Sequence, residues 1–141
     1  MNAPYVIERV FNAPASKVWY AITNAYEMKK WYFDLPGFTP EVGYTFSFFG
    51  GHEDGIQYKH LCRVTCAIEN ERLSYTWSYE GYPGESEVVF ELFAEGKQTR
   101  LKLTHIGLDT FDPGNKDFAA SNFASGWEYI ISTSLDGYLN K

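Results

Sequence analysis

The chain has 141 residues, which fits one domain spanning residues 1–141, and 26 of them are aromatic (11 Phe, 11 Tyr and 4 Trp). Its 12 basic and 18 acidic residues give a net charge of −6, and no basic run interrupts the sequence. Nucleic-acid binding depends on clustered Lys and Arg, so the composition argues against a nucleic-acid partner.

The N-terminal residues lack the pattern of a signal peptide, and no apolar run reaches the 18 to 20 residues of a membrane span. We therefore expect a cytoplasmic protein that does not span a membrane. Cys62 and Cys66 lie four residues apart in an expected strand. Four strand steps cover about 13 Å, far more than the roughly 5.5 Å between the Cα atoms of a disulfide, which predicts two reduced thiols.

The first 40 residues predict one strand and two short helices. β-forming side chains alternate over residues 5–11. Pro14 suits the first turn of a helix, which ends near Thr23, and a second helix covers residues 25–31. Two prolines make residues 35–40 a loop that leads into the main sheet.

From Gly43 onward the apolar period changes to two, which predicts five strands joined by short turns, an antiparallel meander. In the strand over residues 58–68, alternation places Cys66 and Ile68 on the same face as His60. The faces expected to point inward carry Tyr44, Phe46 and Phe48, then His60, Cys62, Val64, Cys66 and Ile68, then Leu73, Tyr75, Trp77 and Tyr79, then Val88, Phe90 and Leu92, and last Leu101, Leu103 and His105.

After residue 114 the period becomes helical again, and apolar residues three and four apart predict one amphipathic helix from about Lys116 to Leu139. Gly126 lies inside this helix and lowers its stability, so we expect close packing at that position. An antiparallel sheet covered on one face by a long helix is an α+β architecture.

Three segments resemble a known family. They are Phe11-x-Ala13-Pro14-x-x-x-Val18-Trp19-x-Ala21-x-Thr23, Arg72-Leu73-x-Tyr75-x-Trp77, and Thr99-x-Leu101-x-Leu103-Thr104-His105-x-Gly107, with Gly126-Trp127 in the last helix. Together they resemble the activator of heat-shock protein 90 ATPase homologue family of the START/birch-pollen-allergen-like (SRPBCC) superfamily. The resemblance implies a helix-grip fold, in which a curved antiparallel sheet of six or seven strands wraps around a long C-terminal helix and two short helices close one end. It also implies a cavity between sheet and helix that takes small apolar molecules.

The inward aromatic residues have two interpretations: the lining of a ligand cavity, or an ordinary packed core. A cavity interpretation uses the residues on the strand faces together with those of the helices that face them. Its candidate lining is Trp31, Phe46, Phe48, His60, Cys62, Tyr75, Trp77, Tyr79, Phe90, His105, Phe123, Trp127 and Ile131.

His60 and His105 are either polar groups of the cavity or hydrogen-bonded structural histidines, and no carboxylate partner is evident for either. Cys62 lies next to His60 on the same face but lacks the setting of a nucleophile, so a small buried side chain is the better interpretation. Residues 52–54 (His-Glu-Asp) have no second ligand pair, so no metal site is predicted. No nucleotide-binding or nucleophile-elbow motif occurs, and no cofactor is expected.

The leading hypothesis is therefore a domain that binds a small hydrophobic or aromatic molecule. Two alternatives follow from the resemblance. One is an interaction module with a chaperone partner, as the family name implies, and the other is a cyclase or hydratase that uses the same cavity. The enzyme alternative requires an acid–base pair that the sequence does not place.

Overall fold

A computed structural model describes residues 4–51 and 55–139. It has one six-stranded antiparallel sheet with the strand order β1-β6-β5-β4-β3-β2. The strands are β1 (Tyr5–Phe11), β2 (Thr45–Gly50), β3 (Tyr58–Ile68), β4 (Arg72–Tyr79), β5 (Ser86–Glu95) and β6 (Gln98–Ile106). Strands β2 to β6 form the predicted meander, and β1 closes the order by pairing with β6.

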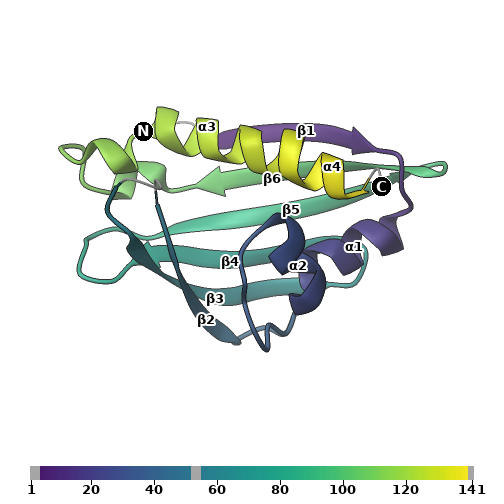
Figure 1. Ribbon diagram of the computed structural model, residues 1–141, viewed down its shortest axis with the longest axis horizontal. Helices are drawn as coiled ribbons and strands as arrows, with labels where there is room; N and C mark the ends of the chain where they lie inside the picture. Colours follow the sequence, from purple (N-terminus) through teal and green to yellow (C-terminus); the bar gives the residue numbers. More distant parts are fainter. Residues whose placement is uncertain (1–3, 52–54, 140–141) are drawn as a thin grey trace.

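Two short helices, α1 (Ala15–Thr23) and α2 (Ala25–Trp31), follow β1 and lie over the sheet near one end, as predicted (Figure 1). Asn24 separates them because it is extended, and its side chain caps α2 by accepting a hydrogen bond from the Glu27 N–H. The last helix runs lengthwise above β1, β6 and β5 (Figure 1). The fold is the predicted α+β helix-grip arrangement.

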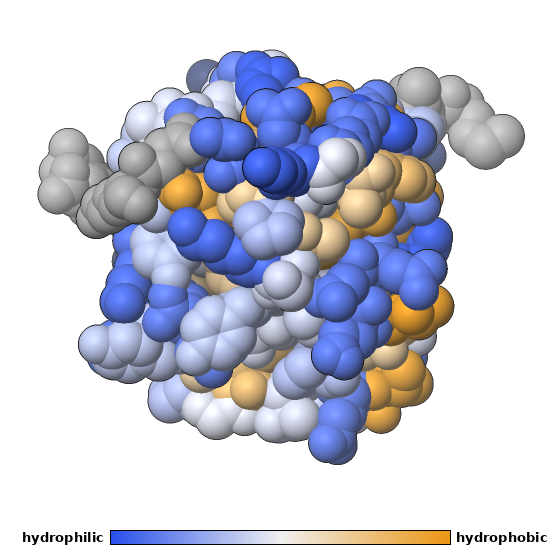
Figure 2. Space-filling model, turned by 90° about the vertical axis from the view of Figure 1, so that its right-hand side faces the viewer, coloured by the Kyte–Doolittle hydropathy of each residue, from blue (hydrophilic) through white to orange (hydrophobic). Residues whose placement is uncertain are grey.

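The predicted inner faces of β4 and β6 are confirmed. Tyr75, Leu101 and Leu103 are at most 1% exposed, and His105 is completely buried among them. The end of the molecule near the β5–β6 turn is mostly hydrophilic, with hydrophobic side chains in separate patches and toward one edge (Figure 2). The large apolar and aromatic side chains are therefore concentrated between the sheet and the helices.

The predicted inner face of β3 is correct only up to Val64. A β-bulge between Val64 and Cys66 shifts the register, so that Cys66 pairs with Ser74 and the next residue, Ala67, packs against the core. Ile68 is 47% exposed, and Cys66 is only partly buried. The sequence prediction was wrong here because strict alternation assumes a ladder without an inserted residue.

The last helix begins at residue 120 and not at Lys116. Residues Leu108–Thr110 (η1) and Lys116–Phe118 (η2) form single short turns, and the extended backbone of Ala119 ends the second of them. The helix then consists of α3 (Ala120–Tyr129), a π-helical stretch η3 (Ile130–Leu135) and α4 (Asp136–Leu139). Among the described residues, no helix is long and apolar enough to cross a membrane.

The π-helical stretch keeps one side of this helix facing the sheet. Its buried residues recur every four positions: Phe123, Trp127, Ile131, Leu135 and Leu139. On an α-helix of 3.6 residues per turn, each four-residue step drifts by about 40° around the axis. The wider π turns cancel part of this drift, so five successive side chains remain in contact with the core.

Gly126 is exposed on this helix, and a Cβ atom at this position would have no atom within 4 Å. The expectation of close packing at Gly126 was therefore wrong. The glycine borders open space, a point that matters for the cavity described below.

The buried stripe leads to a stability prediction. Replacing Ile131, which is completely buried, by Ala should lower the free energy of unfolding by about 2–5 kcal/mol, because it removes methylene groups from the core. Thr133→Ala, at an exposed position of the same π-helical stretch, is the control and should change it by less than about 0.5 kcal/mol. Urea unfolding followed by circular dichroism measures both, and equal effects would contradict the arrangement of the stripe.

Candidate functional site

A cavity of about 680 Å³ opens between α2, the β3–β4 part of the sheet and the C-terminal helix. Its volume falls within the range of small-molecule sites, roughly 300–1,000 Å³. Six of the residues predicted from the sequence line it: Trp31, His60, Trp77, Tyr79, Phe123 and Trp127.

The other predicted residues do not line the cavity. Phe46, on β2, contacts Phe38 and Tyr75 instead, and Ile131 is buried against the sheet. All of these residues belong to the surrounding core or pack against it: Phe46, Phe48, Cys62, Tyr75, Phe90, His105 and Ile131. The predicted lining is thus divided between a cavity and a filled interior.

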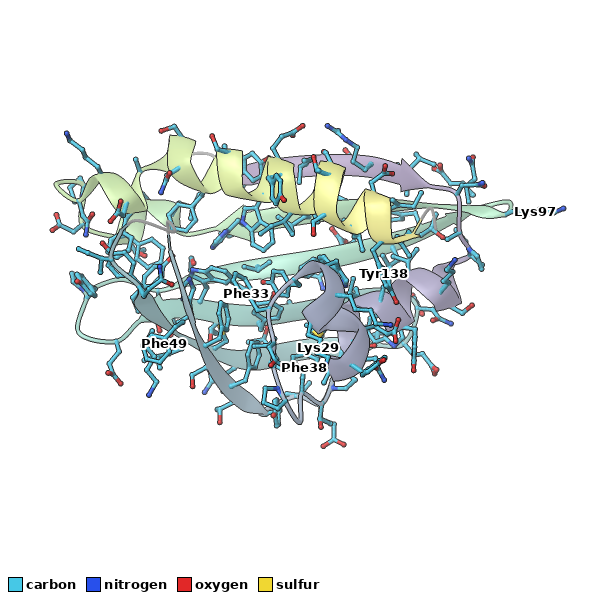
Figure 3. The ribbon with its side chains drawn as sticks, in the orientation of Figure 1. Lys29, Phe33, Phe38, Phe49, Lys97 and Tyr138 are labelled. Atoms are coloured by element: carbon cyan, nitrogen blue, oxygen red, sulfur yellow. The ribbon has the colours of Figure 1, made fainter. Side chains whose placement is uncertain are left out.

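Sequence analysis missed fifteen of the lining residues, among them two aromatic groups. Tyr32 and Phe33 follow the end of α2, and Asp117 and Phe118 belong to η2, which was predicted as part of a helix. Figure 3 shows Phe33 extending from the end of α2 over the middle strands of the sheet. The aromatic run Trp31-Tyr32-Phe33 was the one signal in the sequence that pointed here. The missed lining also includes Lys29, Lys30, Gly50, Gly51, Tyr58, Asn122, Ser125, Gly126, Tyr129, Ile130 and Ser134.

Stacked rings form the walls of the cavity. Tyr32 stacks on Trp31, at 5.1 Å between ring centroids, and on Trp127, at 6.2 Å, with interplanar angles of 25° and 21°. At the other end of the cavity, Phe118 stacks on Tyr79 at 4.5 Å. Such walls offer extended apolar faces to a flat ligand.

Gly50 allows two further rings to approach the wall. A side chain at this position would lie 3.1 Å from the His60 Cε1 atom and 3.3 Å from the Phe33 Cε1 atom. Phe33 stacks on Phe48 at 4.2 Å, and His60 stacks on the same Phe48 ring at 4.4 Å. The absence of a side chain at residue 50 therefore lets this cluster close over β2.

His105 belongs to a chain of buried hydrogen bonds. The Trp127 Nε1–H donates to His105 Nδ1 over 2.9 Å, and because an indole only donates, Nδ1 carries no proton. His105 Nε2–H therefore donates to Ser86 Oγ over 2.7 Å, and the Ser86 hydroxyl donates to the Trp77 carbonyl over 3.2 Å. Burial lowers the pKa of His105 to about 3, so the ring is neutral at pH 7. Both ring nitrogens have hydrogen-bond partners within the protein, so His105 is a hydrogen-bonded structural histidine and not a polar group of the cavity.

His60 does line the cavity, but it is held by its own strand. Its Nδ1–H donates to the Tyr58 carbonyl over 2.9 Å, since a carbonyl only accepts. Burial lowers the pKa of His60 to about 4. At pH 7 the imidazole is therefore a neutral member of an aromatic wall.

The polar groups of the cavity lie at its two ends. At one end the Tyr58 hydroxyl donates to the Asp117 carboxylate over 2.5 Å, and the Asn122 side chain donates to the Asp117 carbonyl over 2.9 Å. At the other end lie Lys29 and Lys30, which contact the exposed ring of Tyr26 at 5.1 and 4.4 Å. The interior between them is aromatic.

Nowhere in residues 4–51 and 55–139 do three His, Cys, Asp or Glu side chains gather closely enough to hold a metal ion. The residues weighed as a metal candidate, 52–54, lie outside the described residues. Both cysteines are free thiols, as predicted.

A curved antiparallel sheet, a long C-terminal helix gripped by it and two short helices after β1 define the class, a helix-grip domain. Residues 12–140 match the model of the family described as "Activator of Hsp90 ATPase homolog 1-like protein". The chain belongs to this family, which confirms the resemblance inferred from its motifs. No curated protein sequence matched the chain.

Solved structures share the fold over the whole chain. Mll3558 from Rhizobium loti is similar with a TM-score of 0.82 and 19% identity, covering 97% of this chain and 96% of that one. MLL2253 from Mesorhizobium loti has a TM-score of 0.77 and 26% identity, with 98% and 97% covered. CalU16 from Micromonospora echinospora has a TM-score of 0.71 and 25% identity, with 95% and 74% covered.

The neutral His60 predicts a pH-dependent stability. An unfolded histidine binds its proton near pH 6.5, whereas the folded ring binds it only near pH 4, so acid favours the unfolded chain between these values. We expect His60 to lower the free energy of unfolding by up to about 1.4 kcal/mol per pH unit as the pH falls from 6.5 to 4. Urea titrations of the wild type and His60→Phe at several pH values measure this: the variant should show a shallower slope. Identical slopes would contradict a neutral buried His60.

Proposed function

We propose that this protein binds a small, flat aromatic or hydrophobic molecule in the cavity between α2, the sheet and the C-terminal helix. One observation carries the proposal. A space of about 680 Å³ with aromatic walls lies beside the C-terminal helix, although Ile131 and Leu135 of the same helix are completely buried in the core. Apolar burial would supply most of the affinity, at roughly 25 cal/mol per Å².

The electrostatics of the walls favour an uncharged aromatic centre in the ligand. His60 is neutral at pH 7, and Trp77 Nε1–H is already bonded to the Tyr79 hydroxyl over 2.8 Å. Burial raises the pKa of Tyr79 far above neutrality, so this hydroxyl keeps its proton. Among the described residues, the charged groups of the lining are Lys29, Lys30 and Asp117, and a polar substituent of the ligand would meet the lysines or the Tyr58–Asp117 pair.

The same geometry gives less support to catalysis. Acid–base work needs a group that exchanges its proton near neutral pH. The imidazole of His60 has a strongly lowered pKa, and its Nδ1–H is committed to a backbone carbonyl. The Asp117 carboxylate accepts from Tyr58 and has no histidine among its hydrogen-bond partners in the described part of the chain.

Fluorine NMR tests this function residue by residue. The protein is labelled with 5-fluorotryptophan, which places a probe at each of the four tryptophans. Trp31, Trp77 and Trp127 line the cavity, whereas Trp19, on α1, does not. With 2-naphthol as the probe ligand, we expect the three lining resonances to shift together in a saturable titration while Trp19 stays fixed. Shifts at Trp19 alone, or no saturable shift with 2-naphthol or a panel of aromatic metabolites, would refute the proposal.

Gly126 offers a variant that blocks the cavity without disturbing the core. Because Gly126 lines the cavity and a Cβ atom there meets nothing within 4 Å, Gly126→Phe should place a ring in the space and weaken 2-naphthol binding by about tenfold or more. Gly137→Phe is the matched control, since Gly137 also has open space around it, lies on the same helix and is outside the lining. Isothermal titration calorimetry compares the two, and equal losses of affinity would count against the cavity as the binding site.

A further inference from the structure

We propose that Tyr32 is a partition that sets the depth of the cavity and thereby the length of the ligand it accepts. The part of this inference that concerns ligands rests on the proposed function, whereas the part that concerns depth rests on the packing of Tyr32 alone.

Tyr32 is in contact with both the cavity and the packed core. Its ring lines the cavity, while its hydroxyl forms a 2.6 Å hydrogen bond with the hydroxyl of Tyr75. Tyr75 is 1% exposed and lies outside the cavity lining. One side of Tyr32 therefore faces open space, and its tip reaches the filled interior.

Around Tyr75, beyond the hydroxyl of Tyr32, lie three of the residues that the sequence assigned to the cavity and that the structure places in the core: Phe46, Cys62 and Phe90. Phe46 packs edge-on against Tyr75 at 5.2 Å, and Phe90 lies against the same ring at 6.0 Å. Cys62, 4% exposed, is the cross-strand partner of Phe46 and so lies beside the Phe46–Tyr75 contact. Burial first, and then Tyr75 and Cys62, raise the pKa of Tyr32. These side chains begin where the ring of Tyr32 ends.

The position of Tyr32 is fixed from several sides. It follows α2 directly as the C-cap residue, and its backbone N–H donates to the Met28 carbonyl over 2.7 Å. Trp31 stacks on one side of its ring, and Phe33 packs edge-on at 4.6 Å between centroids. The hydroxyl pair with Tyr75 then holds the tip. A ring anchored in this way acts as a wall and not as a mobile side chain.

A shorter residue at this position would join the two compartments. Truncation to Ala removes a whole aromatic ring and its hydroxyl, leaving space for several waters at about 30 Å³ each, next to the Tyr75 hydroxyl that they can hydrogen-bond. The lengthened cavity would then reach Cys62. The wild-type protein is thus matched to short ring systems, and residue 32 decides where the ligand must end.

Thiol labelling tests the depth of the cavity without any ligand. In a Cys66→Ser background, which leaves Cys62 as the one cysteine, the neutral reagent 4,4′-dithiodipyridine reports on access to this buried thiol. We expect Tyr32→Ala to react roughly tenfold faster or more than the parent, at a rate that does not depend on low urea concentrations, because access then occurs in the folded state. Tyr32→Leu, which keeps more of the apolar packing, should lie between the two and serves if the alanine variant fails to fold.

Two controls separate the partition from a general loss of stability. Tyr32→Phe keeps the ring and should label as slowly as the parent. Leu101→Ala truncates a completely buried residue of β6 and should leave Cys62 slow in the absence of urea. Slow labelling in both Tyr32→Ala and Tyr32→Leu, or labelling in Tyr32→Phe or Leu101→Ala as fast as in Tyr32→Ala, would overturn the proposal.

A binding arm links depth to ligand length. The elongated dye 4-phenylazophenol should bind Tyr32→Ala about tenfold more tightly than the parent, while the affinity for 2-naphthol changes less. If Cys62 becomes accessible but neither compound binds any variant, the proposed function fails and the partition stands. If 2-naphthol binds the parent and Cys62 stays protected in both Tyr32→Ala and Tyr32→Leu, only the partition fails.

Discussion

The hydrogen bond from Trp127 to His105 is the contact on which the rest of the architecture depends. It joins the C-terminal helix to β6 through two buried side chains, and it continues through Ser86 to the backbone of β4 at Trp77. An unpaired buried polar group costs about 1–3 kcal/mol, so loss of any member of this chain leaves a neighbour without its partner. The helix is thereby held at one height and one rotation above the sheet.

This fixed attachment explains how the protein can keep a cavity beside a dense core. Near Ile131 and Leu135 the helix packs fully against the sheet, with the π-helical stretch maintaining contact. On the side facing α2 and β3, Trp127 stacks instead on Tyr32, an aromatic residue that follows the end of α2. Aromatic rings are rigid and are held here by their contacts with one another, so they form walls of fixed shape around the space.

Local patterns predicted most of the fold, because the side-chain periods of strands and helices are properties of short segments. The bounds of β1, α2 and β3 and the inward position of His105 followed from alternation and helix signals alone. The errors occurred where contacts with residues far away in the sequence determine the local structure. The bulge that turns Cys66 outward depends on pairing with β4. The last helix starts late because the separate turn η2 precedes it, and Asp117 of that turn accepts a hydrogen bond from Tyr58, 59 residues away. The cavity was harder still: Tyr32 and Phe118 lie in no periodic face, and only the aromatic run at residues 31–33 gave a local signal for Tyr32.

The three walls of the cavity are held with different strength, and this difference assigns them different roles. The sheet wall is part of a continuous ladder. The α2 wall is anchored by Trp31, whose indole donates to the Ala21 carbonyl over 2.8 Å and whose own carbonyl accepts from Ser134 over 2.6 Å. The third wall is the C-terminal helix together with the turn η2 before it, and η2 is tied to the sheet through the bond between Tyr58 and Asp117 and through the stacking of Phe118. The sheet and α2 thus set the shape of the cavity. In contrast, η2 is a single turn between extended residues, so local opening of the cavity to solvent would begin there.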